Sequence, residues 1–229
     1  MKKTIQQFAL SCCLFILLSG TAFSANEYFR SVATGNWNAN GTWQMSANSG
    51  GRWFAATSTP ADTSGLITVQ SPNTVTVTVS VNADQLTVNS GAVLAINASI
   101  ILTIKDGSGT DLYLVNGGTI SGPGTLQTQG ADVYVDIRGN GFSADFKVNT
   151  GKVRVNDASV ASAFFNGTVT IDAGTTFAIQ PGGYPVTLKN NLVNNGIITS
   201  NGGFFIMRGA LLTNNDTIKG SYLYFDSTT

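Results

Sequence analysis

Apolar and polar residues alternate in short runs along most of this chain, and the runs become regular from Leu66 onward. The runs VTVTVSV (75–81), ILTI (101–104), VYVDI (133–137) and KVRV (152–155) place every second residue on a common side. Gly, Asn, Asp or Pro separates most runs, and no stretch keeps the i, i+3, i+4, i+7 spacing of a helix. The pattern predicts an all-β fold of many short strands joined by tight turns.

A repeated phrase indicates how these strands are arranged. LVNGGTI begins at Leu114, LVNNGII at Leu192 and LTNNDTI at Leu212. The last two copies define a period, and the first copy precedes the second by close to four such periods. A period of about 20 residues with two or three short strands is typical of a β-solenoid, in which each coil buries its apolar edge against its neighbours. We therefore predict a single-stranded parallel β-helix over residues 66–229, with about eight coils of about 20 residues each.

The asparagines of the phrase have a structural interpretation. Asn116, Asn194 and Asn214 each follow an inward-facing leucine at the point where the chain is expected to turn a corner. Asparagine tolerates turn conformations, and its amide can bond to an identical amide in the next coil. We expect Asn194 and Asn214 to stack directly, which makes the phrase a stacking signal and not a catalytic motif.

Residues 25–65 differ from the rest of the chain and contain all three tryptophans, Trp37, Trp43 and Trp53. Alternating runs are scarce in this segment. The ends of a solenoid need an atypical covering element, and tryptophan buries a large apolar area. We predict an N-terminal cap whose core is built from the three tryptophans. The alternative is that these rings stack on sugars.

The N-terminus carries the pattern of an export signal. Lys2 and Lys3 precede the apolar run FALSCCLFILL (8–18), and AFS (22–24) offers small residues to a signal peptidase. The apolar run is shorter than the ~20 residues of a membrane-spanning helix. We predict a signal peptide at residues 1–24 and no membrane span in the mature chain, the alternative being a membrane anchor.

Composition narrows the class of protein further. Charged residues make up 10% of the chain, the formal net charge is zero and histidine is absent. Without a basic excess the chain is not expected to bind nucleic acid. The two cysteines, Cys12 and Cys13, lie within the predicted signal peptide, so the mature chain has no disulfide. We expect an exported protein with no cofactor.

Five segments near the start of the mature chain follow one another in a fixed order: SVATGNWNANGTW (31–43), PAD (60–62), ITV (67–69), VTV (75–77) and LTVNSGAVLAI (86–96). This succession resembles a segment that recurs in large secreted surface proteins of Bacteroidota. The resemblance covers residues 31–105. It implies export, a right-handed parallel β-helix and a surface or adhesive role, and it implies no defined catalytic residues.

One outward-facing row carries most of the candidate chemistry. If Val133, Val135 and Ile137 point inward, alternation turns their neighbours outward. The outward residues of this row and of the row one period later are Asp132, Tyr134, Asp136, Arg138, Lys152 and Arg154. We expect Asp132 near Lys152, and Tyr134 or Asp136 near Arg154. The row is interpreted as a solvated face with cross-strand ion pairs, or as a binding site. The alternative is a lyase-type site in which Asp binds calcium and Lys or Arg acts as base.

A second oxygen-rich segment is KDGSGTD (105–111). Asp106, Ser108 and Asp111 could offer oxygen ligands to calcium. Glycine-rich turns between strands have the same appearance, and their spacing here is not that of a known calcium loop. We favour the turn and expect no metal.

These patterns predict a non-enzymatic structural or adhesive module of the cell surface that acts through an extended binding or assembly surface. The alternative is a carbohydrate-active β-helix, either a polysaccharide lyase or a sugar-binding module. The expected partner is a cell-surface or extracellular molecule such as a polysaccharide. The aromatic run YLYF (222–225) lies close to the end of the sequence. It predicts an open strand edge, and therefore further chain or association with another copy.

Overall fold

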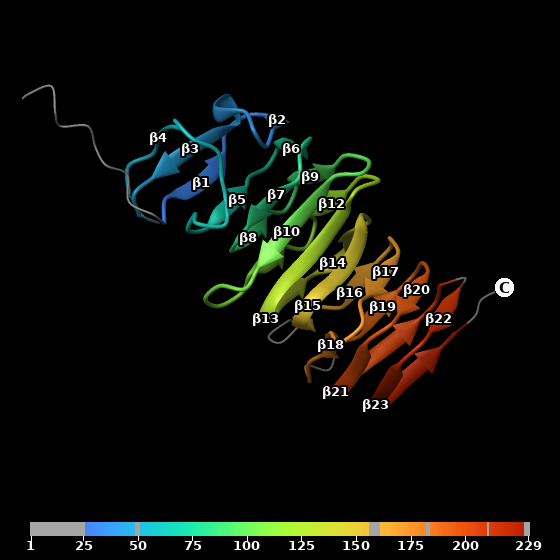
Figure 1. The fold of residues 1–229 in the computed structure, drawn as a ribbon. Coiled ribbons are helices and arrows are strands. Elements are labelled where there is room, and N and C mark those ends of the chain that lie inside the picture. Colours follow the sequence, from blue (N-terminus) through green and yellow to red (C-terminus); the bar gives the residue numbers. More distant parts are fainter. Residues whose placement is uncertain (1–25, 49–50, 156–160, 182–183, 210, 227–229) are drawn as a thin grey trace, which may run out of the picture.

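The computed structural model describes residues 26–48, 51–155, 161–181, 184–209 and 211–226. The predicted signal peptide lies outside the described residues. The described chain forms a parallel β-solenoid of about 7 turns with roughly 21 residues per turn. Its coils follow one another along an elongated body, in chain order from the N-terminal end (blue) to the C-terminal end (red) (Figure 1). The all-β solenoid predicted from the alternation is therefore confirmed.

In the described part of the chain, the parallel strands form three stacks. The first contains β1 (Tyr28–Ser31), β5 (Ile67–Val69), β8 (Leu86–Val88), β11 (Leu112–Leu114), the second part of β13 (Thr125–Ile137), the second part of β15 (Asp145–Val155), β18 (Thr176–Ile179) and the first parts of β21 (Ile197–Met207) and β23 (Thr217–Phe225).

The second stack contains β2 (Gly35–Asn36), β6 (Thr74–Val77), β9 (Val93–Ile96), β12 (Thr119–Ser121), β14 (Gly139–Phe142), β16 (Ala163–Phe165), β19 (Val186–Leu188) and the ends of β21 and β23. The third contains β7 (Val81–Ala83), β10 (Ile101–Lys105), the first parts of β13 and β15, β17 (Val169–Ile171), β20 (Leu192–Asn194) and β22 (Leu212–Asn214).

Inward side chains stack in columns because parallel pairing brings the same position of successive coils together. One column of the second stack runs through Val75, Leu94, Ile120, Phe142, Phe165 and Leu188. All six are at most 1% exposed. The ring centre of Phe165 lies 5.0 Å from that of Phe146 and 6.0 Å from that of Phe177, so phenylalanines from all three stacks fill the middle of the rod.

Two long strands, β13 and β15, pass from the third stack to the first without a separate turn. They bend at Gly130 and Gly151, which pair with each other. A Cβ on Gly151 would lie 1.8 Å from the carbonyl oxygen of Gly130, and the φ of Gly151 is +67°. Only glycine fits this close corner. The bend fixes the positions of the side chains that follow it on both strands.

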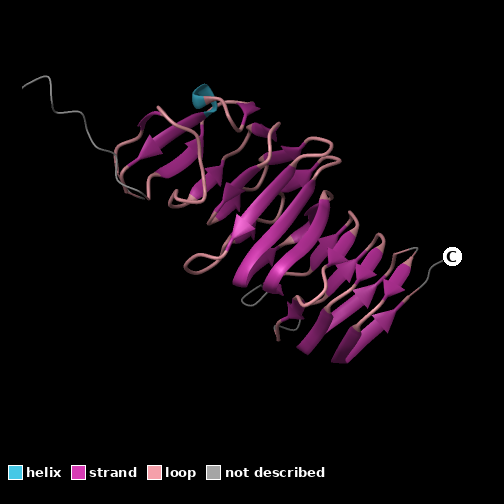
Figure 2. Cartoon of the chain, in the orientation of Figure 1, coloured by secondary structure: helices cyan, strands magenta, loops and turns pink. Residues whose placement is uncertain are grey.

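The N-terminal segment joins the solenoid and also covers it. β1 and β2 pair in parallel with β5 and β6. β3 (Trp43–Ser46) and β4 (Phe54–Ala55) add an antiparallel ribbon beside β1. A 3₁₀ turn at Asn40–Thr42 is the only helical element among the described residues (Figure 2). Within that part of the chain, no helix has the length and apolar character needed to cross a membrane.

The spacing of the repeated phrase is only partly a solenoid period. Leu192 and Leu212 pair directly, so the interval between them is one coil. Leu114 instead belongs to the first stack, where it pairs with Val88 and Ile137, and its interval to Leu192 is no whole number of coils. Coil length varies as well, since the step from Ile67 to Leu86 is shorter than the next step, from Leu86 to Leu112. Longer coils leave about 7 turns where about eight were expected.

Candidate functional site

Seven outward side chains, six on β11, β13 and β15 and one directly after β13, form the cluster that we call the charged face: Tyr113, Asp132, Tyr134, Asp136, Arg138, Lys152 and Arg154. β13 and β15 lie side by side near the middle of the rod (Figure 1). Asp132 is opposite Lys152 and Tyr134 is opposite Arg154 in the register. The expected proximity of these residues is therefore present, with Tyr134 and not Asp136 beside Arg154.

Asp132 is the centre of the first half of the charged face. Lys152 Nζ lies 3.1 Å from Asp132 Oδ1, Arg154 Nε donates to the same oxygen at 2.8 Å, and Arg154 Nη2 contacts Oδ2. Burial acts to raise the pKa of Asp132, but the hydrogen bonds from Arg154 and Lys152 outweigh it, and the pKa falls below its ordinary value. The guanidinium of Arg154 also lies 4.7 Å from the ring centre of Tyr134.

The second half combines the same three types of side chain in a different layout, since its aspartate lies on the coil of the arginine and not on that of the tyrosine. Arg138 donates from Nη2 to Asp136 Oδ2 at 2.8 Å and from Nε to the same oxygen at 3.1 Å. Its guanidinium lies 4.7 Å from the ring centre of Tyr113. The hydrogen bond to Asp136 raises the pKa of Arg138. Asp136 is only 9% exposed, and its Oδ1 has no hydrogen-bond partner among the described residues.

Tyr113 was not among the residues predicted for this site. It pairs with Asp136, which lies one coil later along the chain, across β11 and β13. The available signal was its outward position in the run LYLV, since alternation buries Leu112 and Leu114. The charged face therefore presents two tyrosines, each covered by an arginine that is held by an aspartate. Cation–π and charge-assisted bonds of this kind stiffen the side chains.

The two aspartates considered as calcium ligands, Asp106 and Asp111, accept hydrogen bonds from backbone N–H groups. Asp111 is fully buried and accepts hydrogen bonds from the N–H of Gly107 at 2.8 Å and of Tyr134 at 2.7 Å. Asp106 Oδ2 accepts from the N–H groups of Ala131 and Asp132. Burial raises the pKa of Asp111 to about 6. Across the described residues, no group of three or more His, Cys, Asp or Glu side chains is arranged to hold a metal ion.

The predicted corner asparagines divide into two sets. Asn194 and Asn214 pair in register, and Asn194 Nδ2 donates to Asn214 Oδ1 at 2.7 Å. Asn195 and Asn215 form a second amide pair beside them, also at 2.7 Å. Asn116 is exposed and lies at the turn between β11 and β12, a different corner of the solenoid.

The predicted aromatic core of the cap contains two of the three tryptophans. Trp37 and Trp43 are fully buried, with ring centres 5.2 Å apart in an edge-to-face arrangement. Their indole N–H groups donate to the carbonyl oxygens of Pro60 and Trp37 respectively. Trp53 is only partly buried and lies 4.4 Å from the guanidinium of Arg30. It lies outside this core, directly before the short edge strand β4.

No family model, curated protein or solved structure matches this chain.

Proposed function

We propose that this protein is an exported, non-enzymatic β-solenoid module of the bacterial cell surface, structural or adhesive, that binds an extracellular partner through its charged face. The observation that carries the proposal is the recurrence of one set of side chains, a tyrosine, an arginine and an aspartate, on neighbouring coils. Tyr113 with Arg138 and Asp136 is followed by Tyr134 with Arg154 and Asp132. A repeating partner such as a polysaccharide suits a repeating face.

The rigidity of the rod supports this function. Parallel pairing and a continuous apolar core join the coils, so side chains on neighbouring coils keep fixed spacings close to the ~4.8 Å between strands. A partner that binds several coils at once loses little further entropy from the protein. Tyrosine and arginine are the side chains most often found at strong binding positions.

The lyase alternative is less favoured by the same contacts. Lys152 and Arg154, which would supply the base, both bond to Asp132. Asp136, which would contribute to a calcium site, is held by Arg138. The arrangement is that of interlocked ion pairs, whereas a lyase needs a base directed at its substrate and a separate metal site.

The test is a binding measurement on the mature exported chain, immobilised and exposed to a neutral glucan, a polyuronate and an aminoglycan. The double variant Tyr113→Ala/Tyr134→Ala removes both rings but keeps the Arg–Asp pairs, and it should weaken binding of the preferred polymer about tenfold or more. Phe54→Ala removes an exposed ring on β4, at the N-terminal end of the rod (Figure 1), and should leave binding unchanged. Equal binding by the double variant, no binding to any polymer, or cleavage of one would contradict the proposal.

A further inference from the structure

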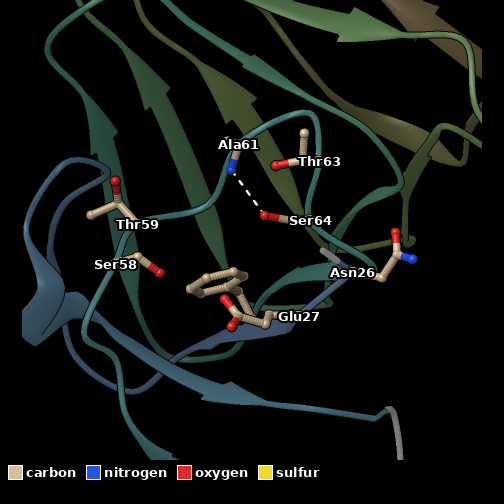
Figure 3. Close-up of a pocket in the computed structure, with 8 residues that line it drawn as sticks. Asn26, Glu27, Ser58, Thr59, Ala61, Thr63 and Ser64 are labelled. Atoms are coloured by element: carbon tan, nitrogen blue, oxygen red, sulfur yellow. Dashed lines mark hydrogen bonds between the residues drawn. The ribbon is translucent and has the colours of Figure 1, made fainter. Parts of the chain in front are cut away.

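A small hollow lies beside β1 at the N-terminal end of the rod (Figure 3), and none of its lining residues belongs to the charged face. Its volume is about 260 Å³, and its lining includes Glu27, Phe29, Ser58, Thr59, Thr63 and Ser64. Pockets for drug-sized ligands are usually larger, about 300–1,000 Å³. The hollow therefore has room for one small chemical unit.

Glu27 is the only glutamate in the sequence. Among the described residues, nothing donates a hydrogen bond or a positive charge to its carboxylate. Partial burial raises the pKa of Glu27, because lost hydration disfavours the charged form. Its backbone is fixed nevertheless, since its carbonyl oxygen accepts from the N–H of Gly65 at 2.9 Å. The carboxylate of Glu27 is therefore held at the hollow as a hydrogen-bond acceptor to which no described residue donates.

Four residues that carry hydroxyl groups line the same hollow. Ser64 Oγ accepts from the N–H of Ala61 at 3.0 Å, so its proton remains available to donate (Figure 3). The side-chain hydroxyls of Ser58, Thr59 and Thr63 form no hydrogen bond within the described part of the chain. They come from one loop, which is fastened by the bond from the Trp37 indole to the Pro60 carbonyl at 3.0 Å.

The remaining lining is apolar or neutral. Phe29 packs edge-to-face against Trp43 at 6.5 Å and is 2% exposed, so it forms a fixed apolar base. Among the residues that the structure describes, no lysine or arginine lines the hollow. A ligand must therefore donate to the carboxylate, exchange hydrogen bonds with hydroxyls, present some C–H surface and carry no negative charge.

We propose that this hollow binds a single sugar unit without negative charge, neutral or amino, whose hydroxyl or amino groups donate to Glu27. The hydroxyls of Ser58, Thr63 and Ser64 complete its hydrogen bonds, and the apolar face of the sugar lies toward Phe29. A uronic acid is rejected, because its carboxylate would lie close to that of Glu27 with no cation between them. The site is independent of the charged face and of the function proposed for it.

The test uses saturation-transfer NMR on the mature exported chain with methyl glucoside, glucosamine and glucuronate at neutral pH. Saturation of one or both of the first two sugars, and little saturation of glucuronate, is expected. Glu27→Gln keeps the shape but halves the acceptor capacity and removes the charge, so it should weaken binding about tenfold, as expected for a hydrogen bond to a charged group. Asp216→Asn, which removes an exposed carboxylate from the other end of the rod, should not.

Unfolding midpoints of the variants are compared with that of the wild type, so that lost structure is distinguished from lost binding. If Glu27→Gln is misfolded, Ser58→Ala replaces it and should also weaken binding. The proposal is overturned by saturation of glucuronate equal to that of the other sugars, by no saturation of any sugar, or by unchanged affinity in the folded variant.

Discussion

The buried side chain of Asn194 donates a 2.7 Å hydrogen bond to Oδ1 of Asn214, its partner one coil later. Asn194 Oδ1 also accepts from the N–H of Gly196, so this amide holds the corner between β20 and β21. Its position would otherwise continue the inward column that contains Ile171. A polar group with satisfied hydrogen bonds therefore replaces an apolar side chain in the core.

Asn194→Ala should lower the free energy of unfolding by about 1–3 kcal/mol, because the Gly196 N–H and the Asn214 amide lose their partner. The matched control is Asn215→Ala, which breaks the exposed pair with Asn195 and should cost less than about 0.5 kcal/mol. Denaturant unfolding of both variants measures the difference. Equal losses of stability in the two variants would show that the buried Asn194 amide stabilises the fold no more than the exposed Asn215 amide does.

Stability should decline as pH rises through the range in which Asp111 ionises. Burial raises its pKa to about 6 in the folded chain, above the ordinary value of 3.8. The folded state then binds the proton more tightly than the unfolded state. The resulting stabilisation is complete below about pH 4 and is lost as pH rises through about 6.

Thermal unfolding between pH 4 and pH 8 checks this dependence, with Asp111→Asn as the test variant. The amide cannot ionise, so the decline should be smaller, although the variant loses one of two acceptor oxygens and is less stable throughout. Asp216→Asn is the control and should keep the wild-type profile. If Asp111→Asn shows the full wild-type decline in stability with pH, another titratable group causes that decline.

Phe165 should be among the most sensitive positions of the core. Its ring lies 5.2 Å from that of Phe142 and 5.0 Å from that of Phe146, centre to centre. Phe165→Ala should reduce the free energy of unfolding by about 3–5 kcal/mol, since a cavity at this crowded level cannot close fully. Phe54→Ala, at a position 53% exposed, provides the comparison in the same denaturant series and should be almost neutral.

Export is expected to remove residues 1–24, on the evidence of Lys2, Lys3 and the apolar run that follows. The intact mass of the protein recovered from the outside of the cell should correspond to a chain that begins near Ala25 and contains no cysteine. Retention of Cys12 and Cys13 in that mass would contradict the signal peptide.

The alternation of apolar and polar residues was sufficient to predict the all-β fold class and many strand positions. The runs at 101–104, 133–137 and 152–155 lie within β10, β13 and β15, because inward and outward residues differ in polarity there. Strand β14 is among those that alternation does not indicate. It has four residues, two of which are Gly139 and Gly141.

The phase of the repeat could not be predicted from spacing alone. Leu114 and Leu192 occupy similar phrases but different stacks, since loops of variable length separate the coils between them. The same variation concealed Tyr113, because its partner Asp136 lies further along the chain than the period of the repeated phrase. Glu27 and the hydroxyls beside it lie on irregular segments with no periodicity to bring them together.

If this protein acts as a binding rod through its charged face, a bound polymer must protect that face. The measurement is hydrogen–deuterium exchange of the mature chain with and without the polymer that binds best. Protection is expected at Leu112–Leu114 and in the second parts of β13 and β15, and it should disappear in Tyr113→Ala/Tyr134→Ala. Protection confined to strands of the third stack, such as β17, β20 and β22, would contradict the proposed function. No change in exchange anywhere along the chain would contradict it as well.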